Sequence, residues 1–131
     1  MTDETIDQAS DAIDAGTVAR LLDSVGGDAS FVDELVDAYL GDAPNHLTAI
    51  GTAIAAGSAE DLVRPAHTLK SSSATVGALG LSTIARELEL NARAGSLEGA
   101  AERHRAATAE YARVTDSLAE WRAGGWQPVE D

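Results

Sequence analysis

The feature that most constrains the fold of this chain is a series of long segments in which apolar residues recur three or four positions apart. Such spacing places the apolar side chains on one face of an α-helix. Very short breaks that contain glycine separate the segments, at residues 57–58, 76–78 and 95–96. Short connections between long helices leave the neighbours antiparallel, so the sequence predicts an all-α fold. We expect an antiparallel up-and-down four-helix bundle with a short accessory helix at its N-terminal end.

The boundaries of the domain follow from where this periodicity begins and ends. Residues 1–14 have no clear apolar period and are expected to form a flexible leader, while residues 15–123 form the bundle domain. Residues 124–131 are expected to be a disordered tail, in which Trp126 is the side chain that packs if any does. The expected helices cover residues 18–25, 28–57, 59–74, 79–94 and 97–123.

Pro44 interrupts the first of the long segments. Proline lacks a backbone N–H and bends or ends a helix. Because the apolar stripe resumes beyond Pro44, we interpret it as a kink within one helix; two helices that meet at a tight corner would give the same pattern. The apolar residues of this stripe are Phe31, Leu35, Tyr39, Leu47, Ile50 and Ile54.

Charge and composition restrict the partners of the chain. Its formal net charge is −13, and residues 1–42 carry eleven acidic side chains and one basic one. Nucleic acids and anionic membranes bind clustered Lys and Arg, so both are disfavoured. The chain has no cysteine, which excludes disulfides and thiol nucleophiles, and it has no apolar run of the roughly 18 residues that a membrane helix needs. We expect a cytoplasmic monomer.

His67 lies on the outer face of the helix expected over residues 59–74. Residues of an α-helix are about 100° apart, so His67 points roughly 140° away from the core-facing arc. Packing therefore gives no reason for a histidine at this position. A neutral imidazole at cytoplasmic pH can attack phosphorus through a ring nitrogen. The residues of the core-facing arc are Leu62, Ala66, Leu69 and Ser73.

The neighbours of His67 on its own face are one lysine and several small or apolar residues. Lys70 is the single lysine of the chain, and its ammonium can offset the charge of a phosphoryl group. Ser71 follows Lys70, while Val63 and Ala74 are candidate docking residues one and two turns away. Small neighbours leave the ring open to another macromolecule. Since no nucleotide-binding loop or general base accompanies the histidine, these residues indicate a phosphate carrier.

The motif AHTLKSSS at residues 66–73, followed by VGA at residues 76–78, resembles the signature of histidine-containing phosphotransfer (HPt) domains. The similarity extends to the flanking helices, GGDASFVDELVDAYLGDAPNHLTAI upstream and LSTIARELELNARAG downstream. It covers about residues 15–120.

This resemblance implies that His67 accepts and donates the phosphoryl group and that Lys70 supports it electrostatically. Ser71 stands where the family commonly has glycine, and its hydroxyl could contact the phosphoryl group or face water. Gly77 matches the glycine that ends the histidine helix, which is a structural role. Pro65 departs from a regular helix, and it leaves open whether the histidine helix starts later than residue 59.

Three residues on the next helix are further docking candidates. Arg86, Leu90 and Arg93 share the face opposite the core at helical spacing, where an outward leucine between two arginines would suit an acidic partner. A solvated face with one apolar residue is the alternative. In the family, the positions of Glu89 and Arg93 often carry polar side chains near the phosphohistidine, which favours Arg93.

The other two histidines are weaker candidates. His104 lies near the apolar stripe of its helix and is expected to be packed or hydrogen-bonded, and His46 follows Pro44 as a helix-surface residue. A three-histidine metal site is disfavoured because the three come from distant segments and His67 points away from the core. We assign no metal site.

The resemblance therefore predicts phosphotransfer between His67 and aspartates of receiver domains, on response regulators or hybrid histidine kinases of a two-component phosphorelay. The receiver would supply the acyl phosphate and its Mg²⁺, and this chain would bind no cofactor. A chain of 131 residues leaves no room for the nucleotide-binding half of a histidine kinase, so we expect a phosphocarrier and not an enzyme. The alternative is a non-phosphorylated helical adaptor that regulates a receiver or kinase by binding alone. A metal-binding bundle ranks below both.

Overall fold

The computed structural model describes residues 12–128, and this part of the chain forms five α-helices and no strand. The prediction of an all-α fold is confirmed. Each break expected from glycine falls between two helices. The helices are α2 (Ala15–Ser24), α3 (Ala29–Ala55), α4 (Ala59–Thr75), α5 (Leu79–Arg93) and α6 (Ala100–Ala123).

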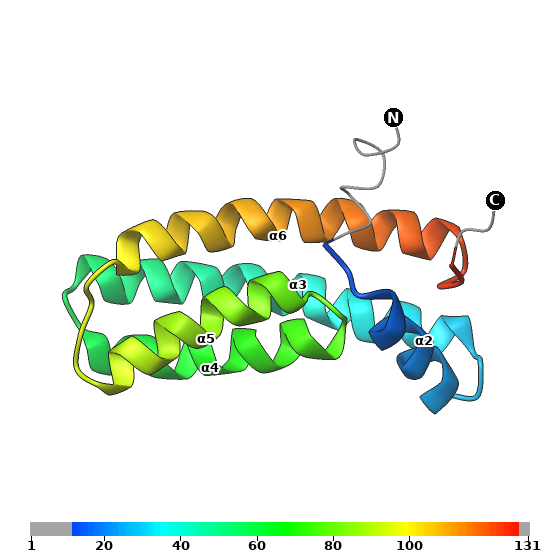
Figure 1. Cartoon of the computed structure of the whole chain (residues 1–131), viewed down its shortest axis with the longest axis horizontal. Helices are drawn as coiled ribbons and strands as arrows, with labels where there is room; N and C mark the ends of the chain where they lie inside the picture. The colour runs from blue at the N-terminus through cyan, green and yellow to red at the C-terminus, as the bar shows by residue number, and fades with distance from the viewer. Residues whose placement is uncertain (1–11, 129–131) are drawn as a thin grey trace.

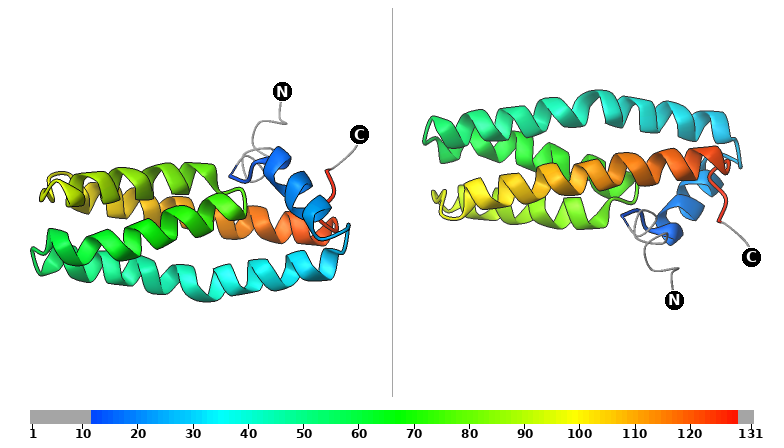
Figure 2. Two further views of the ribbon diagram at one scale, coloured as in Figure 1. Left: turned by 90° about the horizontal axis from the view of Figure 1, so that it is seen from below. Right: turned by 90° about the horizontal axis from the view of Figure 1, so that it is seen from above.

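Helices α3 to α6 lie side by side, and the turns that join them lie at alternate ends of the bundle (Figure 1). The longest helices, α3 and α6, have 27 and 24 residues, whereas α4 and α5 have 17 and 15. The long pair therefore extends beyond the short pair at one end. Helix α2 lies at that end, beside the first turns of α3 and the last turns of α6 (Figure 2).

Side chains and glycines set the limits of the helices. Asp14, Asp28 and Ser58 cap α2, α3 and α4 by accepting a hydrogen bond from a backbone N–H of the first turn. Gly57 ends α3 with φ of 69°, a left-handed conformation that costs glycine little. The next residue then donates its N–H to the Ala53 carbonyl, which completes a Schellman turn.

Pro44 lies inside one continuous helix, as the sequence predicted. Because proline has no N–H, the carbonyl of Leu40 loses its donor within the helix. The Tyr111 hydroxyl of α6 donates to this carbonyl at 3.5 Å. Two turns further along α3, His104 donates from Nε2 to the carbonyl of Leu47 at 2.8 Å. These two bonds tie α6 to α3.

The exposed residues of the first half of α3 correct the predicted stripe. Phe31 and Leu35 are 52% and 41% exposed, whereas Val32 and Val36 are buried. A four-residue step turns about 400° around a helix, so a stripe read at constant spacing of four drifts by about 40° per step. Counting back from Tyr39 at that spacing therefore leads off the buried face. Phe31 and Leu35 form an apolar surface on α3.

The segments at both ends of the described chain pack more closely than the sequence predicted. Trp126 is 2% exposed and donates from Nε1 to Asp33 at 2.8 Å, although it belongs to the tail expected to be disordered. Ala12 and Ile13 are buried as well, although they belong to the expected leader. These contacts are tertiary and leave no periodic signal in so short a segment. Residues 1–11 and 129–131 lie outside the described part of the chain.

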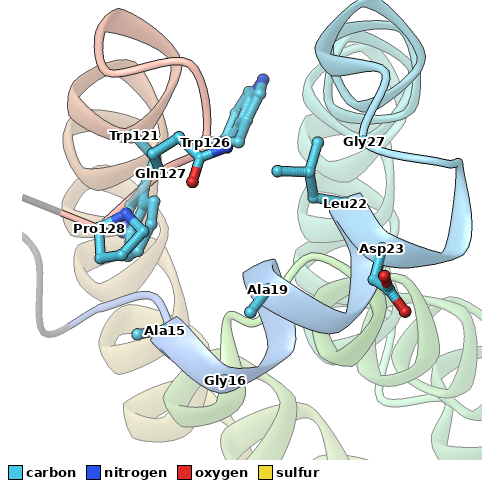
Figure 3. A pocket seen from close by; sticks show the side chains of 10 residues that line it. All are labelled: Ala15, Gly16, Ala19, Leu22, Asp23, Gly27, Trp121, Trp126, Gln127 and Pro128. Atoms are coloured by element: carbon cyan, nitrogen blue, oxygen red, sulfur yellow. The ribbon is translucent and has the colours of Figure 1, made fainter.

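A hollow of about 490 Å³ lies between α2 and the end of α6 (Figure 3). Its wall is mainly apolar and includes both tryptophans of the chain, Trp121 and Trp126. His67 and its neighbours are not part of this wall, so the hollow is separate from the candidate site.

Candidate functional site

Helix α4 positions His67. Ser58 caps the helix, and Glu60 and Asp61 lie in its first turn, where acidic side chains interact favourably with the helix dipole. The helix begins at Ala59, so Pro65 does not delay its start. The carbonyl that Pro65 leaves without a helical donor belongs to Asp61, which is exposed to water.

The core-facing arc of α4 is buried as predicted, and it leaves His67 on the opposite face. Ser73 is fully buried, and its hydroxyl is paired with the Tyr39 hydroxyl of α3 at 2.9 Å. The His67 side chain is 52% exposed. The other buried residues of this arc are Leu62, Ala66 and Leu69.

The His67 ring is held from α5 by Glu89. The Nδ1 atom of His67 lies 2.9 Å from Oε2 of Glu89. An ionised carboxylate only accepts hydrogen bonds, so Nδ1 carries the proton and donates it. The neutral ring then has its lone pair on Nε2, and none of the described residues is paired with that atom.

Glu89 is a buried carboxylate surrounded by three cationic or polar partners. It is 3% exposed, and besides His67 it contacts Lys70 and Arg93. Burial by itself raises the pKa of Glu89, but Lys70, Arg93 and His67 together outweigh burial and lower this pKa to about 2. The carboxylate is therefore charged at every physiological pH.

Lys70 reaches the same carboxylate from α4. Its Nζ atom lies 2.9 Å from Oε1 of Glu89, where the two groups form an ion pair at hydrogen-bond distance. The backbone carbonyl of Lys70 accepts a hydrogen bond from the Ser82 hydroxyl at 2.8 Å, which fixes the lysine backbone against α5. The ammonium is thus placed one turn from His67. Ser71, the next residue, is exposed.

Glu89 is the residue of this cluster that sequence reasoning did not assign to the site. A signal was present: Glu89 falls on the buried arc of α5, four residues after Ala85 and next to Leu88. A carboxylate on a buried arc requires cationic or hydrogen-bonding partners. His67 and Lys70, on the outer side of the adjacent helix, are those partners.

The docking candidates on α5 divide into two kinds. Arg86 is exposed, and Leu90 is 48% exposed. Arg93 is instead bound to Glu89, with Nε at 2.9 Å and a second guanidinium nitrogen at 2.8 Å from Oε2. On α4, Val63 and Ala74 are half-buried. Arg93 therefore belongs to the carboxylate cluster, while Arg86 and Leu90 are open surface.

A groove on the α3 side of His67 was not predicted. It has a volume of about 210 Å³ and runs between α3 and α4, next to the residue that follows His67. Leu35, which is exposed, lies at its edge. Its lining residues are Leu35, Ala38, Tyr39, Asp42 and His46 of α3 and Thr68, Ser72, Thr75 and Val76 of α4.

Gly77 ends the histidine helix with φ of 86°. Its carbonyl accepts a hydrogen bond from the N–H of Asp14 at 2.8 Å, which joins the start of α2 to the end of α4. A Cβ atom at this position would lie 3.2 Å from the Asp14 carbonyl oxygen. Both the conformation and the space therefore suit glycine.

Two searches of the described residues bear on other functions. Between residues 12 and 128, no three His, Asp or Glu side chains are grouped so that they could hold a metal ion. The helices of this region are also too short or too polar to cross a membrane.

Comparisons with known proteins agree with this geometry. The profile of the Hpt domain family matches residues 34–124, and the chain therefore belongs to the Hpt domain family. Among solved structures, the fold is similar to histidine-containing phosphotransfer protein B (HptB) from Pseudomonas aeruginosa PAO1. The two chains share 27% sequence identity with a TM-score of 0.74, and the match covers 85% of this chain and 96% of the other. No curated protein sequence matches the chain.

Proposed function

We propose that this protein is a phosphocarrier in a two-component phosphorelay, and that His67 accepts a phosphoryl group from one receiver-domain aspartate and donates it to another. One observation carries the proposal: the His67 side chain is exposed, its Nδ1 atom is engaged by Glu89, and none of the described residues is paired with Nε2. Membership of the Hpt domain family and the similarity to a histidine-containing phosphotransfer protein support it.

The chemistry assigned to His67 is nucleophilic substitution at phosphorus. The Nε2 lone pair attacks the phosphorus of the aspartyl phosphate, the N–P bond forms, and the bond between phosphorus and the carboxyl oxygen breaks. The aspartate leaves as a carboxylate. The Nδ1 proton stays on the ring, hydrogen-bonded to Glu89, so no proton has to move in this step.

Lys70 is assigned the support of the phosphoryl group. Its ammonium has three donors, and the contact with Oε1 of Glu89 needs only one of them, so the others are available to a group on Nε2 while the ion pair stays in place. The hydroxyl of exposed Ser71 is a second candidate donor on the same face. In this proposal the receiver supplies the Mg²⁺ and the remaining electrostatic stabilisation. This chain is assigned no ATP-dependent kinase activity of its own.

The docking surface is assigned to both sides of His67. On one side lies the groove between α3 and α4, with Leu35 and Phe31 as its apolar extension. On the other side Leu90 and Arg86 project from α5. An apolar centre with a polar rim is typical of interfaces between proteins, and the positive charges near His67 suit the acidic site of a receiver.

A transfer assay with paired histidine variants tests the proposal. Receiver domains phosphorylated with ³²P are mixed with wild type, His67→Gln and His46→Gln, because His46 is a second histidine on the same side of the bundle. Acid-labile label is expected on wild type and His46→Gln and not on His67→Gln. Label that persists on His67→Gln would show that the acceptor is elsewhere. If wild type bound the receiver but acquired no label, the result would instead favour an adaptor that acts by binding alone.

A further inference from the structure

We infer that Glu89 is a positioning residue that keeps the Nδ1 proton on the phosphorylated His67 ring, so that the histidine leaves phosphorus as a neutral imidazole when the group is passed on. This inference rests on the proposed function. It concerns the donation of the phosphoryl group, the step after phosphate acceptance. It assigns to one carboxylate the control of whether the His67 ring leaves as a neutral imidazole or as an imidazolate anion.

The geometry gives Glu89 this role. Oε2 lies 2.9 Å from Nδ1, on the side of the ring opposite Nε2, so phosphorylation of Nε2 leaves the contact in place. The carboxylate is only 3% exposed, and a buried charge acts more strongly on its neighbours than one in water. Cations on either side fix its position, Lys70 at Oε1 and Arg93 at Oε2.

The state of Nδ1 decides how well the ring leaves. When Nε2 bears the phosphoryl group and Nδ1 bears a proton, the ring is a cation. Attack by a receiver aspartate then breaks the N–P bond, the bonding pair returns to Nε2, and neutral imidazole departs. If Nδ1 has lost its proton, the departing group is an imidazolate anion, which is a far stronger base and a poorer leaving group. A carboxylate hydrogen-bonded to Nδ1 stabilises the cation and so favours retention of the Nδ1 proton.

Other charged groups near His67 either favour or oppose a positive charge on its ring. Lys70 and Arg64 on α4 and Arg93 and Arg86 on α5 are cations, which oppose a positive ring. The α3 side of the groove beside Thr68 carries Asp42 and His46. Glu89 is the acidic group in hydrogen-bond contact with the ring, so its removal and the removal of a cation that neutralises it are expected to have opposite effects.

The test compares the pH dependence of phospho-His67 in four proteins. Each is phosphorylated with phosphoramidate, a small donor with a P–N bond, so that labelling needs no receiver. The ³¹P chemical shift is then followed with pH to give the pKa of the ring. Glu89→Gln keeps the shape of the side chain without its charge, and Arg93→Gln removes the guanidinium bound to the same oxygen. Glu87→Gln is the control, an exposed carboxylate two residues away.

The ring pKa is expected to fall by about one unit or more in Glu89→Gln, to rise in Arg93→Gln and to stay unchanged in Glu87→Gln. One unit corresponds to roughly tenfold slower transfer to an unphosphorylated receiver at alkaline pH, with little change at pH 6. If the two substitutions only disturbed the packing, the ring pKa would change in the same direction in Glu89→Gln and Arg93→Gln. Either that result or an unchanged ring pKa in Glu89→Gln overturns the inference. Absence of label on wild-type His67 would instead overturn the proposed function.

Discussion

The Nζ atom of Lys70 and the Nδ1 atom of His67 each lie 2.9 Å from a different oxygen of the same Glu89 carboxylate. Two residues one turn apart on α4 are thus linked through a buried side chain of α5. The proposed nucleophile and the proposed phosphate-supporting cation are therefore held in a fixed relationship before any phosphoryl group arrives.

Replacement of Lys70 by alanine should slow phosphotransfer while the protein stays folded. A hydrogen bond to a charged group contributes about 1.5–3 kcal/mol, so the transfer rate should fall by roughly 10- to 100-fold. Rapid-quench transfer from a phosphorylated receiver measures the rate, and circular dichroism checks the fold. Arg105→Ala, which removes an exposed cation of α6 outside the proposed docking surface, is the control and should change the rate much less. An equal loss of transfer rate in both variants would mean that Lys70 acts only through the overall charge of the protein and not through contact with the phosphoryl group.

The buried carboxylate should make stability depend on pH in an acidic window. The pKa of Glu89 is lowered from 4.5 to about 2 in the folded state, so its contribution is fully present above about pH 4.5 and is lost as pH falls toward 2. The shift corresponds to roughly 3 kcal/mol. Urea unfolding at pH 6, 4 and 3 should give a shallower loss of stability for Glu89→Gln than for wild type. Glu87→Gln should keep the wild-type slope, and equal slopes in all three proteins would contradict the assignment.

Gly77 should tolerate alanine less well than a glycine of similar conformation in open space. Gly95 also has a left-handed backbone, with φ of 83°, but a Cβ atom there would meet nothing within 4 Å. Gly95→Ala should therefore cost only the conformational strain, about 1–2 kcal/mol. Gly77→Ala adds close contacts with Asp14 and Ile13, so its loss of unfolding free energy should be larger. Equal losses of unfolding free energy would mean that Ile13 and Asp14 move aside to accommodate the new Cβ atom at little cost.

The hydroxyl of Tyr111 should matter because of Pro44. Tyr111→Phe removes the donor to the Leu40 carbonyl, and the expected loss is about 0.5–1 kcal/mol. In a Pro44→Ala background the helix can supply its own N–H to that carbonyl, so the same change should cost less. A double-mutant cycle measured by chemical unfolding gives the coupling. Full additivity would show that the hydroxyl does not compensate for proline.

The helices and the histidine face could be predicted because they depend on local periodicity. The arc of Leu62, Ala66 and Leu69 follows the 3.6-residue repeat of α4, and its opposite face places His67 in solvent. Pro44 and Pro65 also lie within continuous helices. The Tyr111 hydroxyl donates to the carbonyl that Pro44 leaves free, and the carbonyl that Pro65 leaves free belongs to exposed Asp61.

The pairing of particular side chains could not be predicted, because it depends on contacts between distant segments. Glu89 lies 22 residues from His67 along the chain, and only the packing of α5 on α4 brings them together. Trp126 is buried by a contact with Asp33, 93 residues away. The exposure of Phe31 was misread for a local reason, because a constant four-residue spacing drifts around the helix.

The most direct test of the central claim is to identify the phosphorylated atom. The protein, labelled with ¹⁵N, is phosphorylated by a receiver domain, and long-range ¹H–¹⁵N correlation spectra of the histidine rings are recorded. The prediction is one phosphohistidine, at residue 67, with phosphorus on Nε2 and a proton on Nδ1. Phosphorus on Nδ1 of His67, on His46 or His104, or on no histidine at all would contradict it.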